Sequence, residues 1–226
     1  MKALVLFSGG IDSTTALGLA IKKYGKEQVI ALSVSYGQKH DKEIRAAIAV
    51  AEYYGVEHLF LDLSKIFQYS NCSLLRSTEE IPEESYAEQI SKRNGDKPVS
   101  TYVPFRNGLF LSSAASIALS KECGVIYYGA HADDSAGFAY PDCSPVFNQA
   151  MNEAIWEGSG HQLKIEAPFV NVSKAEVVRI GLELGVPYEL TWSCYEGGEK
   201  PCGKCGTCID RAAAFQANHV EDPALR

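Results

Sequence analysis

Two groups of residues in this sequence have the types and spacing that could carry chemistry, and the first is Ser8-Gly9-Gly10-Ile11-Asp12-Ser13. It follows an apolar run over residues 3–7 and precedes a run with helical spacing. Its glycines let the backbone approach a ligand closely, and successive N–H groups at the start of a helix form a concavity that suits phosphate. Ser8 and Ser13 add hydroxyl donors. The loop predicts a nucleotide site, the alternative being an ordinary strand–helix turn without a ligand.

This loop lacks the marks of two widespread phosphate-binding motifs. No lysine follows the glycines, so it is not the Gly-x-x-x-x-Gly-Lys-Ser/Thr loop that grips β- and γ-phosphates. The Gly-x-Gly-x-x-Gly pattern of dinucleotide sites is also missing. A cradle for the tail phosphates without that lysine leaves the α-phosphorus of ATP as the natural point of attack.

The second group is a set of four cysteines with the spacing Cys-x7-Cys-x2-Cys-x2-Cys, namely Cys194, Cys202, Cys205 and Cys208. Four thiolates at this spacing predict a closed zinc site, which fastens structure because it leaves no open position for water or substrate. Four cysteines could also hold an iron–sulfur cluster, and a redox or sulfur-carrying pair is a third alternative. The other cysteines lack metal spacing and are expected to be core or loop thiols: Cys72, Cys123 and Cys143.

Further polar residues fall where predicted strands end or helices begin. Tyr36-Gly37-Gln38 follows one predicted strand and Gly129–Asp134 follows another, while Val103–Asn107 precedes a helix rich in small residues. Loops at strand ends often carry function, which singles out Arg106, Asp133 and Asp134. The alternative for these three residues is a salt-bridged loop with capping aspartates.

Lys174 lies in the first turn of a predicted helix, where the helix dipole disfavours a cation. It is therefore either a plain surface lysine or a cation placed beside a phosphate. For His131 the expectation is a hydrogen-bonded structural histidine.

Alternating strand and helix patterns predict the fold. Each predicted strand is a short apolar run, and each predicted helix repeats apolar residues at helical spacing. Such alternation implies a doubly wound parallel sheet in an α/β fold, with the ligand beyond the carboxyl ends of the strands. From 68 to 98 the periodicity fades, which indicates a lid, a binding loop or a solvated insertion. The predicted strands are 3–7, 29–34, 57–62, 125–129 and 163–167, and the predicted helices are 12–24, 41–54, 109–123, 145–156 and 173–184.

The composition is that of a soluble α/β domain. With 226 residues, of which 46% are apolar and 22% charged, the chain can form one domain with a sizeable core, or one with an appendage. No apolar run reaches the length of a membrane helix, and no signal peptide is recognisable. A net charge of −7 argues against a protein that mainly grips nucleic acid. Seven cysteines without a secretory signal favour a reduced, cytoplasmic chain. We therefore expect neither a nucleic-acid partner nor a membrane.

Several motifs together resemble one family. Ser8–Ser13 resembles the pyrophosphate loop (PP-loop) of the N-type ATP pyrophosphatases, which generally cleave ATP between the α- and β-phosphates. With this loop occur the Tyr36–His40 turn, Val103–Asn107, Gly129–Asp134 and the terminal cysteines, followed by Arg211 and Ala214-Phe215. The whole chain resembles the 7-cyano-7-deazaguanine synthase family nearly end to end, with no departure at the motif positions.

This resemblance implies a reaction, a fold and partners. The family's activity converts 7-carboxy-7-deazaguanine, ammonia and ATP into the nitrile through an amide. The implied fold is an adenine nucleotide alpha hydrolase-like sheet over residues 1–190, with a zinc-binding C-terminal segment over residues 191–226, often in a homodimer. Free ammonia is the implied nitrogen source, because no glutaminase segment is recognisable.

The resemblance also implies site residues. Lys174 would steady the departing phosphates, with Mg²⁺ sharing their charge, and Arg106 would pair with the substrate carboxylate. Asp133 or Asp134 would either accept the hydrogens of the guanine-like edge or hold Mg²⁺, and the sequence leaves both roles open. The implied set is Phe7, Ser8, Gly9, Gly10, Ile11, Asp12, Ser13, Thr14, Thr15 and Lys174 for ATP, Tyr36, Arg106, Asn107, Asp133 and Asp134 for the substrate, and Cys194, Cys202, Cys205 and Cys208 for one zinc ion.

Three other functions fit parts of the sequence. A tRNA sulfur-transfer enzyme would combine the same loop with a reactive thiol and a basic face, whereas here the cysteines are clustered and the chain is acidic. A non-enzymatic zinc ribbon would not need the nucleotide loop. Another amide-forming ligase is excluded only by the family resemblance.

Overall fold

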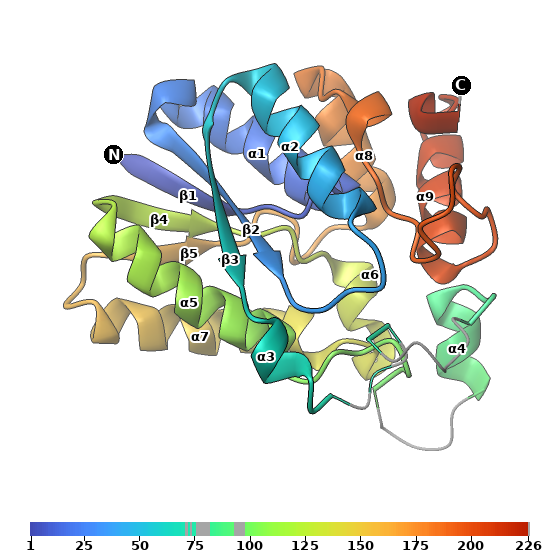
Figure 1. The fold of residues 1–226 in the computed structure, drawn as a ribbon, viewed down its shortest axis with the longest axis horizontal. Coiled ribbons are helices and arrows are strands. Elements are labelled where there is room, and N and C mark those ends of the chain that lie inside the picture. The colour runs from blue at the N-terminus through green and yellow to red at the C-terminus, as the bar shows by residue number, and fades with distance from the viewer. Residues whose placement is uncertain (71, 73, 76–81, 93–97, 226) are drawn as a thin grey trace.

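Five strands form a single parallel sheet: β1 (Lys2–Leu6), β2 (Val29–Ser35), β3 (Glu57–Asp62), β4 (Cys123–Tyr127) and β5 (Lys164–Glu166). The structure is a computed structural model that describes residues 1–225 except 71, 73, 76–81 and 93–97. The strand order is β3-β2-β1-β4-β5 (Figure 1). The chain adds β2 and then β3 on one side of β1, and it adds β4 and then β5 on the other side. The strand order therefore reverses between β1 and β4. In open α/β sheets, ligands bind outside the carboxyl ends of the strands at such a reversal.

Both sides of the central strands are buried. In β1, Ala3 and Val5 belong to the apolar core on one side of the sheet, while Leu4 and Leu6 belong to the core on the other side. Successive side chains of a strand point to opposite faces, so a strand covered on both faces is apolar throughout. This explains the continuous apolar run at the start of the sequence.

Helices cover both faces of the sheet, as Figure 1 shows, and the predicted doubly wound parallel sheet is confirmed. One face carries α1 (Ile11–Tyr24), α2 (Lys42–Tyr54) and α8 (Lys174–Leu184), with α9 (Gly206–Ala217) packed on α8. The other face carries α5 (Arg106–Ser120) and α7 (Pro145–Gly158). The remaining helices are α3 (Ser64–Phe67), α4 (Tyr86–Lys92), α6 (Ala132–Ser135) and the 3-10 turns Lys26–Gln28, Ala136–Phe138, Pro141–Cys143, Tyr188–Leu190 and Pro223–Leu225.

One predicted helix is displaced along the chain. The helix expected over 109–123 runs instead from Arg106 to Ser120, and β4 already begins at Cys123. Phe105, with φ 55°, and Glu122, with φ 59°, take left-handed conformations that end the flanking segments just outside this helix. Arg106 therefore lies in the first turn of α5 rather than in a loop.

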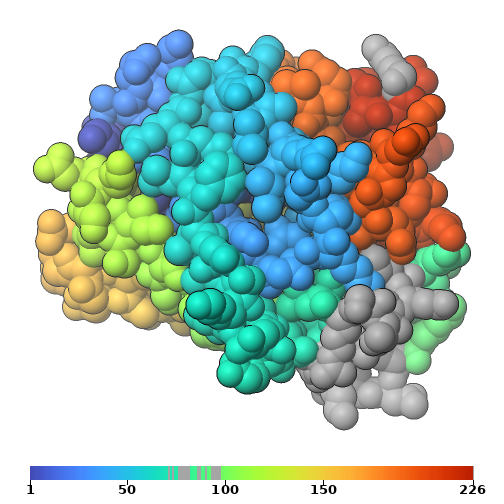
Figure 2. Space-filling model, viewed as in Figure 1, coloured from blue at the N-terminus to red at the C-terminus, as the bar shows by residue number. Residues whose placement is uncertain are grey.

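The stretch from 68 to 98 contacts the C-terminal part of the chain. Its described part includes α4, and Glu83 forms an ion pair with Lys204. Figures 1 and 2 show α4 beside the orange and red C-terminal residues. The rest of the stretch, at 71, 73, 76–81 and 93–97, lies outside the described residues, so the lid or insertion stays a prediction. In the part of the chain that the structure describes, every helix is too short or too polar to span a membrane.

A buried ion pair ties the C-terminus to the body of the protein. Arg211 on α9 donates from Nε to Asp222 Oδ2 at 2.6 Å and from Nη2 to Asp222 Oδ1 at 2.8 Å. The same guanidinium donates to Thr191 Oγ1 at 2.9 Å and to the carbonyl oxygen of Tyr188 at 3.2 Å. Every one of these partners is buried, so the guanidinium is enclosed as well as paired. The division of the chain at residue 190 stays a prediction.

Candidate active site

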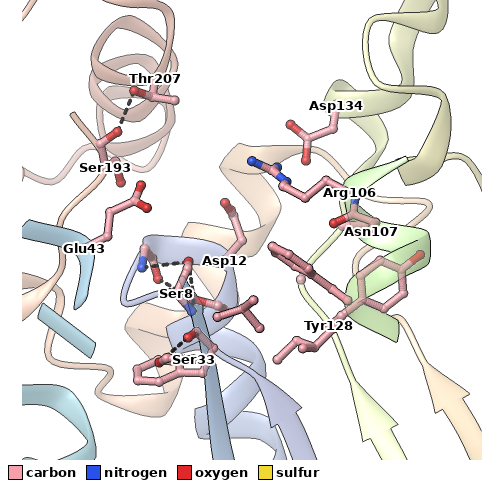
Figure 3. Close-up of a pocket in the computed structure, with 18 of the residues that line it drawn as sticks. Ser8, Asp12, Ser33, Glu43, Arg106, Asn107, Tyr128, Asp134, Ser193 and Thr207 are labelled. Carbon is pink, nitrogen blue, oxygen red and sulfur yellow. Dashed lines mark hydrogen bonds between the residues drawn. The ribbon is translucent and has the colours of Figure 1, made fainter. Parts of the chain in front are cut away.

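A cavity opens at the carboxyl ends of β1, β2 and β4, at the point where the strand order reverses (Figure 3). Ten of the fifteen residues that were predicted for ATP and substrate line it, namely Phe7, Ser8, Gly10, Asp12, Ser13, Tyr36, Arg106, Asn107, Asp134 and Lys174. The other five do not line it, namely Gly9, Ile11, Thr14, Thr15 and Asp133. The fold therefore brings residues from five separate parts of the sequence to one space.

The loop after β1 is held in shape by its own hydroxyl groups. Ser13 Oγ accepts the N–H of Ser8 at 3.2 Å and lies 3.2 Å from the Gly10 carbonyl oxygen, to which it can donate. The two serine Oγ atoms are 3.1 Å apart. Gly10 is the N-cap of α1 and supplies no side-chain cap, so the first N–H groups of this helix lack a capping acceptor from that residue. An uncapped helix N-terminus beside a cavity is an arrangement that binds phosphate.

The two glycines of this loop serve different purposes. Gly9 has φ +81°, and a Cβ there would lie 2.5 Å from the backbone nitrogen of Ala47 and 2.7 Å from the carbonyl oxygen of Glu43, both in α2. The missing side chain thus lets α2 pack against the loop. Gly10 has φ −82°, and a Cβ there would meet protein atoms no closer than 3.4 Å. Protein packing explains Gly9 but not Gly10, whose bare backbone is left to approach a ligand.

Ile11, Thr14 and Thr15 lie on the inner side of α1. Ile11 is fully buried in the apolar core. Thr14 Oγ1 donates to the Gly10 carbonyl at 2.7 Å, and Thr15 Oγ1 donates to the Ile11 carbonyl at 2.9 Å. These side chains anchor α1, and their contact with ATP remains a prediction.

Lys174 reaches the loop from the first turn of α8. Its Nζ donates to Asp12 Oδ2 at 2.7 Å and lies 3.4 Å from His131 Nε2. Burial disfavours the charge of Asp12, but the charges of Lys174 and then of His131 hold the pKa of its carboxyl below the ordinary value. Burial likewise disfavours the charge of Lys174, yet Asp12 and then Asp134 raise its pKa above the ordinary value. A half-buried lysine that is paired with Asp12 beside an uncapped helix end fits a phosphate site better than it fits a plain surface lysine, and its contact with phosphate remains a prediction.

The two aspartates that follow β4 point to different places. Asp133 Oδ2 accepts the backbone N–H of Lys174 at 2.8 Å, so this carboxylate caps the first turn of α8 and lies outside the cavity lining. Asp134 lines the cavity, and its Oδ2 is 3.3 Å from His131 Nε2. Of the two candidates that the sequence left open, Asp134 is the one positioned to meet a ligand. His131 is buried beside these charged groups and its Nδ1 has no hydrogen-bond partner among the described residues, so the hydrogen-bonded structural role expected for it stays a prediction.

Arg106 carries a guanidinium into the cavity from the first turn of α5. Its Cζ lies 5.3 Å from the ring centroid of Tyr36, and its Nη1 donates to the Tyr36 hydroxyl at 3.4 Å. Among the described residues, no carboxylate forms an ion pair with this guanidinium. A half-buried guanidinium without an anionic partner fits a ligand with a carboxylate or phosphate group.

Asn107 is next to Arg106, but its backbone N–H and its side-chain amide nitrogen are engaged by the protein. Its N–H donates to Asp142 Oδ2 at 2.8 Å, and its Nδ2 donates to the Asp142 carbonyl at 3.3 Å and to Cys143 Sγ at 3.2 Å. Asn107 therefore joins α5 to the loop that follows β4. Its contact with the substrate remains a prediction.

Sequence reasoning missed the wall of the cavity opposite Arg106. This wall comes from α2 and from the cysteine segment, and its residues are Glu43, Trp192, Ser193, Tyr195, Thr207 and Asp210. Burial raises the pKa of Glu43 to about 7, although the charge of Arg106 acts to lower it. Burial likewise raises the pKa of Asp210 to about 6, although the charge of Lys174 acts to lower it. The only signal in the sequence was proximity to the cysteines, which places Ser193, Tyr195 and Thr207 next to predicted ligands.

The four predicted metal ligands gather at the start of α9. Their sulfur atoms all lie within 4.8 Å of one another, and Cys202 Sγ is 3.9 Å from Cys208 Sγ. A tetrahedral zinc ion with Zn–S bonds of about 2.3 Å sets its sulfurs about 3.8 Å apart. The N–H of Cys202 donates to Cys194 Sγ and that of Cys205 donates to Cys202 Sγ, each at 3.3 Å. Such hydrogen bonds support thiolate ligands, so this cluster could hold a metal ion.

Comparison with known proteins identifies the family. A sequence model described as queuosine biosynthesis protein QueC matches residues 2–219. The chain belongs to the QueC family. It is 45% identical over 226 residues to a 7-cyano-7-deazaguanine synthase of Archaeoglobus fulgidus, covering 100% of this chain and 90% of the relative. It is 43% identical over 222 residues to a synthase of the same name from Pseudoalteromonas atlantica, covering 98% and 97% of the two chains. The resemblance found in the motifs is thereby confirmed, and this QueC-family chain is an enzyme of queuosine biosynthesis.

Solved structures share the fold of this QueC-family chain. NMN synthetase from Francisella tularensis superposes with a TM-score of 0.53 at 15% identity, covering 97% of this chain and 78% of that one. The U34-tRNA thiolase NcsA from Methanococcus maripaludis, solved with its [4Fe-4S] cluster, gives a TM-score of 0.50 at 16% identity, covering 97% and 66%. At these identities the likeness shows the fold alone.

Proposed function

We propose that this chain is an ATP-dependent ligase that converts 7-carboxy-7-deazaguanine and ammonia into 7-cyano-7-deazaguanine. The observation that carries the proposal is a single cavity with the uncapped start of α1 on one side and, on another, the guanidinium of Arg106, which has no carboxylate partner among the described residues. The loop would hold the phosphates of ATP, Arg106 would hold the substrate carboxylate, and the reacting atoms would meet between them. The names of the relatives support this choice of product.

The reaction would activate the same carbon twice. Attack of the substrate carboxylate on the α-phosphorus of ATP gives an acyl-adenylate and releases pyrophosphate. Ammonia then displaces AMP and leaves an amide. Adenylation of the amide oxygen by a second ATP lets that oxygen leave with AMP, and loss of the remaining N–H protons gives the nitrile. Lys174 and the N–H groups of the loop would stabilise the charge that develops on the departing pyrophosphate.

Mg²⁺ fits beside Asp12. The Oδ1 atom of Asp12 is buried and has no hydrogen-bond partner among the described residues, while Oδ2 is paired with Lys174. Carboxylate oxygens are the ligands that Mg²⁺ prefers, so Asp12, together with Asp134, would hold it. When bound, the ion would share the charge of the triphosphate.

For the cysteine cluster we propose one structural zinc ion. Sulfurs that all lie within 4.8 Å of one another match a single ion better than an iron–sulfur cluster, in which the cysteines bind several iron atoms. All four positions would be taken by the protein, so the ion would fasten the segment without acting on the substrate. The zinc-binding segment over 191–226 would be a unit packed on the body over 1–190.

We also propose a cytoplasmic enzyme, working as a homodimer on small molecules and not on nucleic acid. None of the seven cysteines forms a disulfide bond, which suits a reducing compartment. The net charge of −7 gives no support to a nucleic-acid surface.

The test is incubation with ATP, ammonium and 7-carboxy-7-deazaguanine, followed by mass spectrometry of all products. We expect pyrophosphate and AMP, an amide that rises and then declines, and a nitrile that accumulates. The amide supplied alone should become nitrile only when ATP is present. An amide that is never dehydrated would make the chain an ordinary amide ligase, and sulfur transferred to tRNA would make it a thiolase.

A further inference from the structure

Glu43 brings a carboxyl group into the cavity that the scheme above leaves without a role. It lies in the first turn of α2, is half-buried and lines the cavity. The described residues give its carboxyl group no hydrogen bond and no ion pair within 4 Å. Figure 3 shows this group directed toward the same space as the side chains of Asp12, Arg106 and Asp134.

Glu43 and Arg106 share the cavity without pairing. The charge of Arg106 lowers the pKa of Glu43 against the effect of burial, yet among the described residues the guanidinium donates a side-chain hydrogen bond only to the Tyr36 hydroxyl. Because these opposite charges face the same cavity without pairing, there is room between them for ligands. An anionic group would bind to Arg106 and a cationic group to Glu43. The reaction requires both, because the substrate is a carboxylate and the nitrogen donor is present at neutral pH almost wholly as ammonium.

We propose that Glu43 binds ammonium and accepts the proton that must leave before the nitrogen can attack. This inference rests on the proposed function. The Glu43 carboxylate takes one proton, and the lone pair freed on ammonia forms the C–N bond to the acyl carbon. The C–O bond to the phosphate breaks, and its electron pair leaves with AMP. The nitrogen then loses a second proton to water, and Glu43 returns its own proton to water before the next cycle.

Two observations favour ammonium over the deazaguanine ring edge as the partner of Glu43. The group lies across the cavity from Arg106, which is the side from which a nucleophile would approach a carboxyl carbon held by that guanidinium. Burial gives Glu43 a pKa of about 7, so it can both accept and release a proton near neutral pH. The ring edge, which offers N–H donors, is left with Asp134.

The experiment compares two nucleophiles in Glu43→Gln. Hydroxylamine is largely unprotonated at neutral pH and traps an acyl-adenylate as the hydroxamate, so it needs no proton acceptor. We expect Glu43→Gln to form hydroxamate at the wild-type rate, while kcat/KM for ammonium falls by about 10²-fold or more. Glu52→Gln makes the same chemical change on an exposed part of the same helix and should behave like wild type with both nucleophiles.

The other possible results separate a failure of the Glu43 inference from a failure of the proposed function. A wild-type kcat/KM for ammonium in Glu43→Gln overturns the inference, and so does an equal loss with both nucleophiles, since Glu43 would then serve the substrate or the fold. No hydroxamate from the wild-type enzyme refutes the proposed function instead. Should Glu43→Gln fail to fold, Glu43→Asp keeps the acid at a shorter reach. A loss confined to ammonium in that variant supports the inference, and an equal loss overturns it.

Discussion

Gly9→Ala is expected to destabilise the fold, because the Gly9 position has no room for a methyl group. The left-handed φ of +81° costs an alanine about 1–2 kcal/mol. Its Cβ would also lie 2.5 Å from the backbone nitrogen of Ala47, which cannot rotate away as a side chain would. Such overpacking adds about 1–3 kcal/mol. The sum is about 2–5 kcal/mol, which for a chain of this size lowers Tm on the order of 10 °C.

Gly10→Ala is the matched variant, one residue further along the same loop. Its φ of −82° suits alanine, and its Cβ would meet protein atoms at ordinary distances of 3.4 Å or more. Replacing glycine by alanine at an N-cap costs about 0.5–1 kcal/mol, so the shift in Tm should be a few degrees. The methyl group would instead occupy the space next to the bare backbone where phosphate is proposed to bind. We expect ATP affinity to fall about tenfold or more, which is about 1.4 kcal/mol of binding free energy.

Thermal melting and titration calorimetry with ATP separate the two effects. Gly9→Ala should lose stability first, and Gly10→Ala should lose ATP binding while staying folded. Equal ATP affinity in wild type and a folded Gly10→Ala would place the nucleotide elsewhere. A Gly9→Ala variant that melts with wild type would refute the steric argument about α2.

Three further predictions concern the metal, the lysine and the buried ion pair. Cys205→Ser should lose the one metal ion per chain that elemental analysis is expected to find in the wild type, and should melt earlier; full metal content would contradict the zinc proposal. Lys174→Met removes the 2.7 Å partner of Asp12 and should lower the rate of pyrophosphate release by about 10²–10³-fold, measured by a coupled phosphate assay, whereas an unchanged rate would show that Lys174 does not stabilise the departing pyrophosphate. Asp222→Asn leaves the buried charge of Arg211 without its anion and should lower the free energy of unfolding in urea by about 3–5 kcal/mol; an unchanged midpoint would refute this.

The sheet was predictable because its strands are buried on both faces. A run such as that in β1 has no polar residue to interrupt it, so local pattern and final environment agree. The helix that begins at Arg106 was displaced because its boundaries depend on two residues in left-handed conformations, Phe105 and Glu122. Neither is glycine or asparagine, the residues that usually signal such a conformation, so no local pattern marked these ends.

Residue type alone could not divide the roles at the site. Asp133 and Asp134 are adjacent and chemically identical, and only the position of α8 directs one to a helix cap and leaves the other in the cavity. Gly9 and Gly10 are likewise equivalent in sequence, and the packing of α2 distinguishes them. Glu43 was missed because an acidic residue in the first turn of a helix is ordinary, and only the tertiary fold places Arg106 across from it.

The nucleotide loop and the cysteine cluster, which looked separate in the sequence, are joined through Trp192. The backbone N–H of Trp192 donates to the Gly9 carbonyl at 3.0 Å, and its indole Nε1 donates to the Cys194 carbonyl at 2.8 Å. Thr207, between two of the cysteines, donates from Oγ1 to the Ser193 carbonyl at 2.7 Å, and both residues line the cavity. A metal ion held by four thiolates has no vacant position for the substrate. The metal ion would nevertheless fix the cavity wall and one edge of the phosphate loop. A zinc ion that never contacts the substrate would therefore still determine the geometry of the cavity in which the reaction takes place.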